Sequence, residues 1–145
     1  MRTTKAVARA LGCAYIYDEW GRINLHADKV QKGTTLIAET LPTTGEIDLQ
    51  FSPMVSVSKT AVFAFLQHCD LDFKGKDVGE IIDDMTRLAS RFIIALDATG
   101  DFEPIENPAN FNAVIDFLDA NMAGVRCELT LKEHFSCGTT DDNNA

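Results

Sequence analysis

Nine apolar residues between Val78 and Leu96 recur at the spacing of one helical face, a pattern that limits the fold more than any other feature of the chain. They are Val78, Ile81, Ile82, Met85, Leu88, Ala89, Phe92, Ile93 and Leu96. Acidic residues lie toward the start of this stretch and arginines toward its end, as the helix dipole favours. We therefore predict a long amphipathic helix at about 77–96, capped by Asp77, with its apolar face against a sheet.

Segments with the character of strands precede and follow this helix. Residues 60–67 carry apolar side chains at both odd and even positions and are rich in residues that favour strands. This pattern predicts a central strand covered on both faces. Residues 125–132 alternate apolar with polar side chains, as in a strand with one buried face. Further strands are expected at 34–41, 46–51, 102–105 and 112–119.

The N-terminal region predicts a short helix and then a hairpin. Residues 2–11 carry basic side chains and lack the continuous apolar region of a secretory signal, so we expect a short helix packed on the sheet and no export. Residues 14–17 and 22–25 flank a segment whose Gly21 suits a tight turn. The whole pattern predicts one α+β domain over 1–135, with a mixed, mostly antiparallel sheet, and a disordered tail over 136–145.

Charge, hydropathy and cysteine use exclude several classes of protein. The net charge is −9 and no window gathers lysines and arginines, which argues against specific nucleic-acid binding. The longest apolar run, residues 61–66, is too short to cross a membrane. The four cysteines form no CxxC pair and follow no secretory signal, so we expect free thiols in protein made in a bacterial cytoplasm.

Few residues suggest chemistry. Asp70, Asp72 and His68 are the best candidates for a dispersed active site, but isolated acids are the ordinary surface of an acidic protein. Asp83 and Asp84 fall on the polar face of the predicted helix and are expected to be surface charges as well. His68 and Cys69 are neighbours in a strand and would point to opposite faces. We expect no enzyme activity, cofactor or metal site.

Three aromatic residues cluster in the predicted hairpin. Tyr15 and Tyr17 share one face of a strand, where a role in the core is nearly as good an interpretation as an interface. Trp20 lies at the predicted turn and is the better interface candidate. Trp20 and Tyr17 are therefore the predicted interaction residues.

The order of elements in the second half suggests a family. An apolar strand at 61–66 leads through an acidic loop to the long helix, a short segment at 102–105 and the run Phe117–Arg126 before a final strand. This order, with Asp119-x-Asn121-x-x-Gly124-Val125 as its most diagnostic part, resembles tail terminator or tail completion proteins of tailed bacteriophages and prophages, particularly those of Bacteroides-like hosts.

The resemblance covers residues 61–132, with weaker similarity in the N-terminal helix and at 15–17. It implies a virion structural protein of the tail, which forms a homo-oligomeric ring of about six subunits at the head-proximal end of the tail tube. It implies the tail tube protein and the head-tail connector protein as partners, with DNA passing through the ring. Two alternatives remain open: a bacterial protein that binds a ligand or partner, and an enzyme with a dispersed site.

Overall fold

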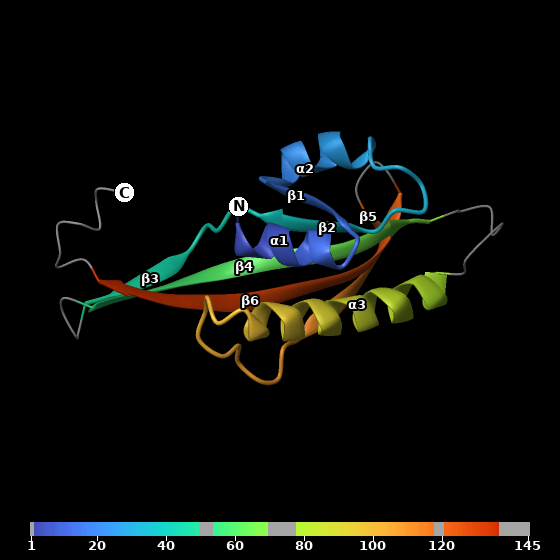
Figure 1. Ribbon diagram of the computed structural model, residues 1–145. Coiled ribbons are helices and arrows are strands. Elements are labelled where there is room, and N and C mark those ends of the chain that lie inside the picture. Colours follow the sequence, from blue (N-terminus) through green and yellow to red (C-terminus); the bar gives the residue numbers. More distant parts are fainter. Residues whose placement is uncertain (1, 50–53, 70–77, 118–120, 137–145) are drawn as a thin grey trace.

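The computed structural model describes residues 2–49, 54–69, 78–117 and 121–136, which form a six-stranded mixed sheet and three helices (Figure 1). In chain order the elements are α1 (Thr3–Ala10), β1 (Ala14–Asp18), α2 (Trp20–Ala27), β2 (Leu36–Thr40), β3 (Gly45–Asp48), β4 (Met54–His68), α3 (Val78–Ala98), β5 (Phe111–Phe117) and β6 (Met122–Ser136). The α+β class, the long helix and the short N-terminal helix are confirmed. Asp77 and the residues 137–145 of the expected tail lie outside the described residues.

The sheet is built around two long antiparallel strands. β4 and β6 pair over their whole length, from Met54 opposite Ser136 to His68 opposite Met122. The other edge of β4 holds two strands end to end, with β3 on residues 56–59 and β2 on residues 63–66. β1 extends the sheet beyond β2 in parallel, and β5 pairs with residues 122–127 of β6. The central position predicted for residues 60–67 is confirmed.

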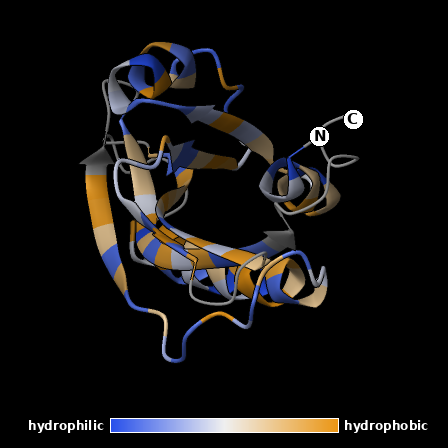
Figure 2. Cartoon of the chain, turned by 90° about the vertical axis from the view of Figure 1, so that its left-hand side faces the viewer, coloured by the Kyte–Doolittle hydropathy of each residue, from blue (hydrophilic) through white to orange (hydrophobic). Residues whose placement is uncertain are grey.

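One end of β4 and β6 extends beyond the helices as an arm. We call this three-stranded part the arm: β3, residues 54–60 of β4 and residues 130–136 of β6. It projects away from the helices on the left of Figure 1. Seen end-on, the sheet is a curved layer whose strands alternate between hydrophobic and hydrophilic residues (Figure 2). The chain therefore has a body with helices on both faces of its sheet and an arm that no described helix covers.

The main core lies between one face of the sheet and the helices α1 and α3. Six residues of the predicted apolar stripe are buried there, and three more are half-buried. Phe92 of α3 packs between Phe63 and Phe65 of β4, with ring centroids 5.1 and 5.3 Å apart. Burial of each large apolar side chain contributes about 1.5–3 kcal/mol, so this interface holds the body together.

A second, smaller core lies under α2 on the opposite face, and it corrects the predicted hairpin. Residues 20–27 are helical because Ile23 and Ala27, one helical turn apart, are both buried against Leu36 and Leu66 of the sheet. β1 therefore does not turn back on itself and pairs in parallel with β2. Packing of this apolar face decided the local structure over the turn propensity of Gly21.

Two further expectations differ from the structure. Residues 102–105 form no strand, although Glu103 donates its backbone N–H to the carbonyl oxygen of Lys132 at 2.7 Å. β3 forms as predicted but is exposed along its whole length, because no layer covers the arm. The strand predicted at 112–119 is confirmed as β5, with the irregular pairing between Val114 and Phe117 that its mixed pattern indicated. Gly124 allows the close approach of β6 to β4, since a Cβ there would meet the carbonyl oxygen of Phe65 at 1.8 Å.

Candidate functional site

The residues that suggested an active site do not come together. His68 places its Nε2 atom 2.9 Å from the carbonyl oxygen of Val30, near the α2 core, whereas Cys69 is buried in the α3 core. Asp83 is exposed, and Asp84 forms an ion pair with Arg87 at 2.7 Å on the same helix. Asp70 and Asp72 lie outside the described residues. Within the described ranges, no group of three His, Cys, Asp or Glu side chains could hold a metal ion.

The two predicted interaction residues lie on opposite faces of the sheet. The ring of Tyr17 lies 3.7 Å from the guanidinium carbon of Arg2, on the side that α1 covers. Trp20 is the first residue of α2 rather than part of a turn, and it is half-buried on the other side, where the guanidinium of Arg126 lies 6.0 Å from its ring. Tyr17 and Trp20 therefore contribute to two separate surfaces.

A buried carboxylate that the strand pattern did not assign lies beside Tyr17. Glu39 of β2 is only 2% exposed. Its Oε1 atom accepts hydrogen bonds from the hydroxyls of Thr4, at 2.7 Å, and Tyr15, and its Oε2 atom pairs with Arg2 at 2.8 Å. The sequence did carry a signal, because a glutamate follows Leu36-Ile37-Ala38 in a run predicted to be a strand. A buried charge requires such partners.

This network ties the N-terminal segment to the sheet. Arg2 and Thr4 come from α1 and the residue before it, Tyr15 from β1 and Glu39 from β2. Burial, together with the hydrogen bond to Glu39, raises the pKa of Tyr15 well above its usual value, so its hydroxyl keeps the proton that it donates. Because both oxygens of Glu39 are engaged, the carboxylate is not free to act as a general base.

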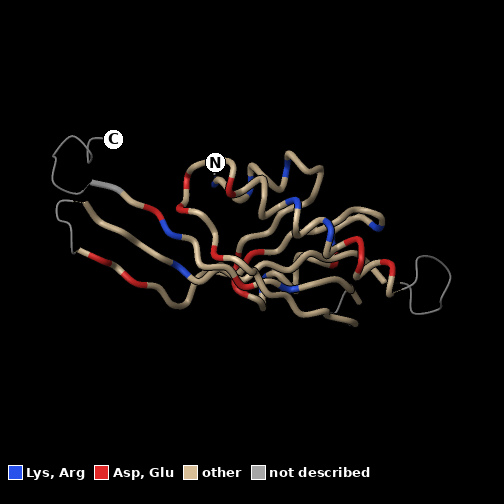
Figure 3. Tube along the Cα trace, turned by 90° about the horizontal axis from the view of Figure 1, so that it is seen from below, with Lys and Arg blue, Asp and Glu red and all other residues tan. Residues whose placement is uncertain are grey.

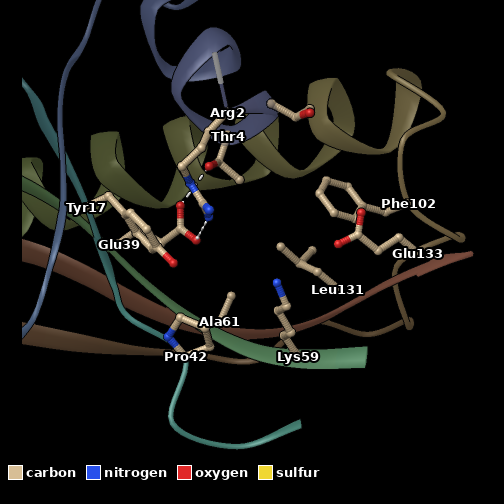
Figure 4. Close-up of a pocket in the computed structure, with 11 residues that line it drawn as sticks. Arg2, Thr4, Tyr17, Glu39, Pro42, Lys59, Ala61, Phe102, Leu131 and Glu133 are labelled. Carbon is tan, nitrogen blue, oxygen red and sulfur yellow. Dashed lines mark hydrogen bonds and ion pairs between the residues drawn. The ribbon is translucent and has the colours of Figure 1, made fainter. Parts of the chain in front are cut away.

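A pocket of about 220 Å³ opens next to the network, at the root of the arm (Figure 4). Arg2, Tyr17 and Glu39 line one side, and Lys59 of β4 and Glu133 of β6 line the other, together with Leu131. The side chain of Lys59 points into the pocket in Figure 4. The pocket therefore offers two cations, two carboxylates and an apolar floor, a combination suited to holding a small polar group in place.

The arm carries an ordered pattern of charge on the face opposite to this pocket. The strand register aligns Glu46, Ser58 and Lys132 in one row across the three strands. In the next row on that face, Asp48 and His134 flank Ser56. Each row therefore runs from an acid on β3, through a hydroxyl on β4, to a base on β6. Figure 3 shows acidic positions along β3, and a basic position next to an acidic one on β6 at the opposite edge of the arm.

The β6 edge of the arm is partly occupied by the segment after α3. The Glu103 carboxylate lies 3.4 Å from Lys132 Nζ and 3.1 Å from His134 Nε2, in addition to the backbone bond to Lys132. The hydrogen bond from His134 and the charge of Lys132 lower the pKa of Glu103. Among the described residues, this is the one backbone hydrogen bond to the outer edge of β6, the edge that faces away from β4, beyond the residues that β5 covers.

No known protein family matches the chain, and no curated protein is similar to it in sequence at a significant level. Within the described residues, no helix is long and apolar enough to span a bilayer. The pocket and the two edges of the arm are therefore the candidate functional surfaces of the described structure.

Proposed function

We propose that the chain is a structural subunit of a phage tail, a terminator or completion protein that forms a ring at the head-proximal end of the tail tube and joins it to the head connector. The order of elements that resembles this family supports the proposal. The observation that carries it is the arm, a three-stranded ribbon whose two edges, β3 and the end of β6, differ in charge.

A ring needs two different surfaces on each subunit, because every copy must contact one neighbour on each side. The arm supplies such a pair of edges, and strand edges readily pair with strands of another chain. Exposed apolar side chains on the arm and directly after β3 support the same function: Ile47 is 71% exposed and Met54 45%, and Leu49, which follows β3, is 62% exposed. Apolar groups at this exposure gain free energy when a partner covers them.

Electrostatics fits a ring that encloses DNA without holding it. The net charge of −9 gives each subunit an overall negative field, which repels the phosphate backbone. A negative lumen would let DNA pass during packaging and ejection. In this proposal the partners are further copies of the chain, the tail tube protein and the connector protein.

The experiment is assembly on tail tubes. Purified protein is added to polymerised tubes, and electron microscopy scores capped ends; in parallel, light scattering follows the mass as the concentration rises. Six copies of the 15.9 kDa chain would give a particle of about 95 kDa. A protein that stays monomeric, caps no tubes and leaves tail length unchanged when its gene is deleted would refute the assignment.

A second candidate function is supported by the pocket beside Glu39, where titratable groups from α1, β2, β4 and β6 converge. Arg2 is paired with Glu39, and Lys59 and Glu133 both line the pocket, so a small compound that carries both an anionic and a cationic group is the class of ligand that fits. Thermal unfolding with a panel of such compounds tests this function. A rise in Tm that Lys59→Ala removes would favour a ligand-binding protein over a ring subunit.

A further inference from the structure

We propose that the β6 edge of the arm binds the β3 edge of a second copy of this chain, and that Glu103 occupies this edge while the subunit is free. This inference deepens the proposed ring function and depends on it. It names the contact surface and its occupant, which ring assembly alone leaves open.

The direction of the strands allows β3 of a second copy to pair with β6. β3 and β6 are both antiparallel to β4, so the two outer edges of the arm run parallel to each other. A neighbour placed beside the arm with its strands in the same direction would add its β3 next to β6, as a parallel pair. Every copy would then use one edge for each neighbour, as a closed ring requires.

The charges on the β3 edge and the β6 edge of the arm complement each other. When the ribbon is continued sideways without a shift, the row that ends in Lys132 meets the neighbour's Glu46, and the row that ends in His134 meets the neighbour's Asp48. Adjacent strands lie about 4.8 Å apart, so each pair falls within the reach of an ion pair. A neighbour turned by half a turn in the plane of the sheet would instead pair like edges, β6 with β6 or β3 with β3, and would lose these ion pairs, which favours the proposed orientation.

Glu103 lies at the place on the β6 edge where a neighbour's β3 would pair. The backbone N–H of Glu103 donates a hydrogen bond to the carbonyl oxygen of Lys132, on the edge of β6 that faces away from β4. The Glu103 carboxylate contacts Lys132 and His134, the same two side chains that the neighbour's acids would meet. It therefore reproduces one residue of an added acidic strand. When a neighbour's β3 arrives, Glu46 and Asp48 take over the contacts with the two bases and the segment at 102–105 moves aside. A free subunit is thereby protected from indiscriminate edge pairing.

Charge reversal tests the pairing directly. Glu46→Lys and Lys132→Glu should each raise the concentration needed for assembly on tubes by about tenfold, and the double variant should restore it. Asp28→Lys and Lys29→Glu, on exposed residues at the end of α2, change the net charge by the same amounts and should leave assembly unchanged. Wild-type assembly should also weaken as salt is raised.

A cysteine pair tests the register. Oxidation of assembled Glu46→Cys/Lys132→Cys protein should link copies into a ladder on a denaturing gel, whereas Glu46→Cys combined with Lys29→Cys should not. Glu103→Ala should lower the concentration needed for assembly, because it removes the competing carboxylate. If rings cap tubes normally in both single charge-reversal variants, the ring function stands and this interface is refuted. If the wild-type protein never assembles, both the ring function and this interface are refuted.

Discussion

Removal of a single hydroxyl, in Tyr15→Phe, should destabilise the protein because it takes one donor from a buried carboxylate. Glu39 is 2% exposed, and without the Tyr15 hydroxyl its described partners are the Thr4 hydroxyl and the Arg2 guanidinium. A hydrogen bond to a charged group contributes about 1.5–3 kcal/mol. For a chain of 145 residues, we expect Tm to fall by roughly 5–10 °C.

Tyr17→Phe is the matched control on the same strand. Tyr17 contacts Arg2 through its ring, which phenylalanine keeps, so the free energy of unfolding should change by less than about 0.5 kcal/mol. Chemical denaturation of both variants, monitored by circular dichroism, gives the comparison. Equal stabilities of the Tyr15→Phe and Tyr17→Phe variants would refute the reasoning that the buried network ties α1 to the sheet.

Three further predictions follow from burial and charge. Leu88→Asp should abolish soluble folding, since an unpaired buried carboxylate costs several kcal/mol, whereas Ile94→Asp on the exposed face of α3 should unfold nearly as the wild type does; thermal unfolding distinguishes them. All four thiols should titrate in denaturant, while the buried ones should resist thiol reagents in the native protein, because burial raises the pKa of Cys127 to about 11. The contribution of Glu103 to stability should be complete above pH 4.5 and fade as pH falls through its lowered pKa, so the difference in unfolding free energy between wild type and Glu103→Gln should vanish in acid.

The sequence predicted the elements whose apolar pattern is long or regular. The helix from Val78 and the strand 125–132 were predicted because many side chains repeat the same period, so one local exception changes little. The region 20–27 was predicted incorrectly because eight residues carry few repeats, and Gly21 favours a turn just as well. Residues 20–27 cover the face of the sheet opposite to α3 because they contact β2 and β4, which are separate elements later in the chain.

The candidate site was less accessible to sequence reasoning, because its parts come from distant segments. Arg2, Glu39 and Lys59 belong to three elements that only the sheet topology brings to one pocket. The rows of acid, hydroxyl and base on the arm need the strand register, which a shift of one residue would destroy. Tyr17 and Trp20 were predicted to be interaction residues of a hairpin that does not form, and their role in an interface stays a prediction.

The same two strands serve the body and the arm, which explains how the arm can be exposed and still fold. In the body, Phe63 and Phe65 of β4 are fully buried under α3. In the arm, Met54 on the same strand is 45% exposed. Ile47 on the adjacent strand β3 is 71% exposed. An isolated ribbon of so few strands is marginal in water, so continuous pairing with the buried halves of β4 and β6 must hold it in place. A pocket that binds a small ligand would need only the part of the arm that supplies Lys59, Leu131 and Glu133, and not its full extension. A subunit that adds its edge to a neighbour would need it, because the arm carries the pairing edges beyond the helices, where another copy can reach them.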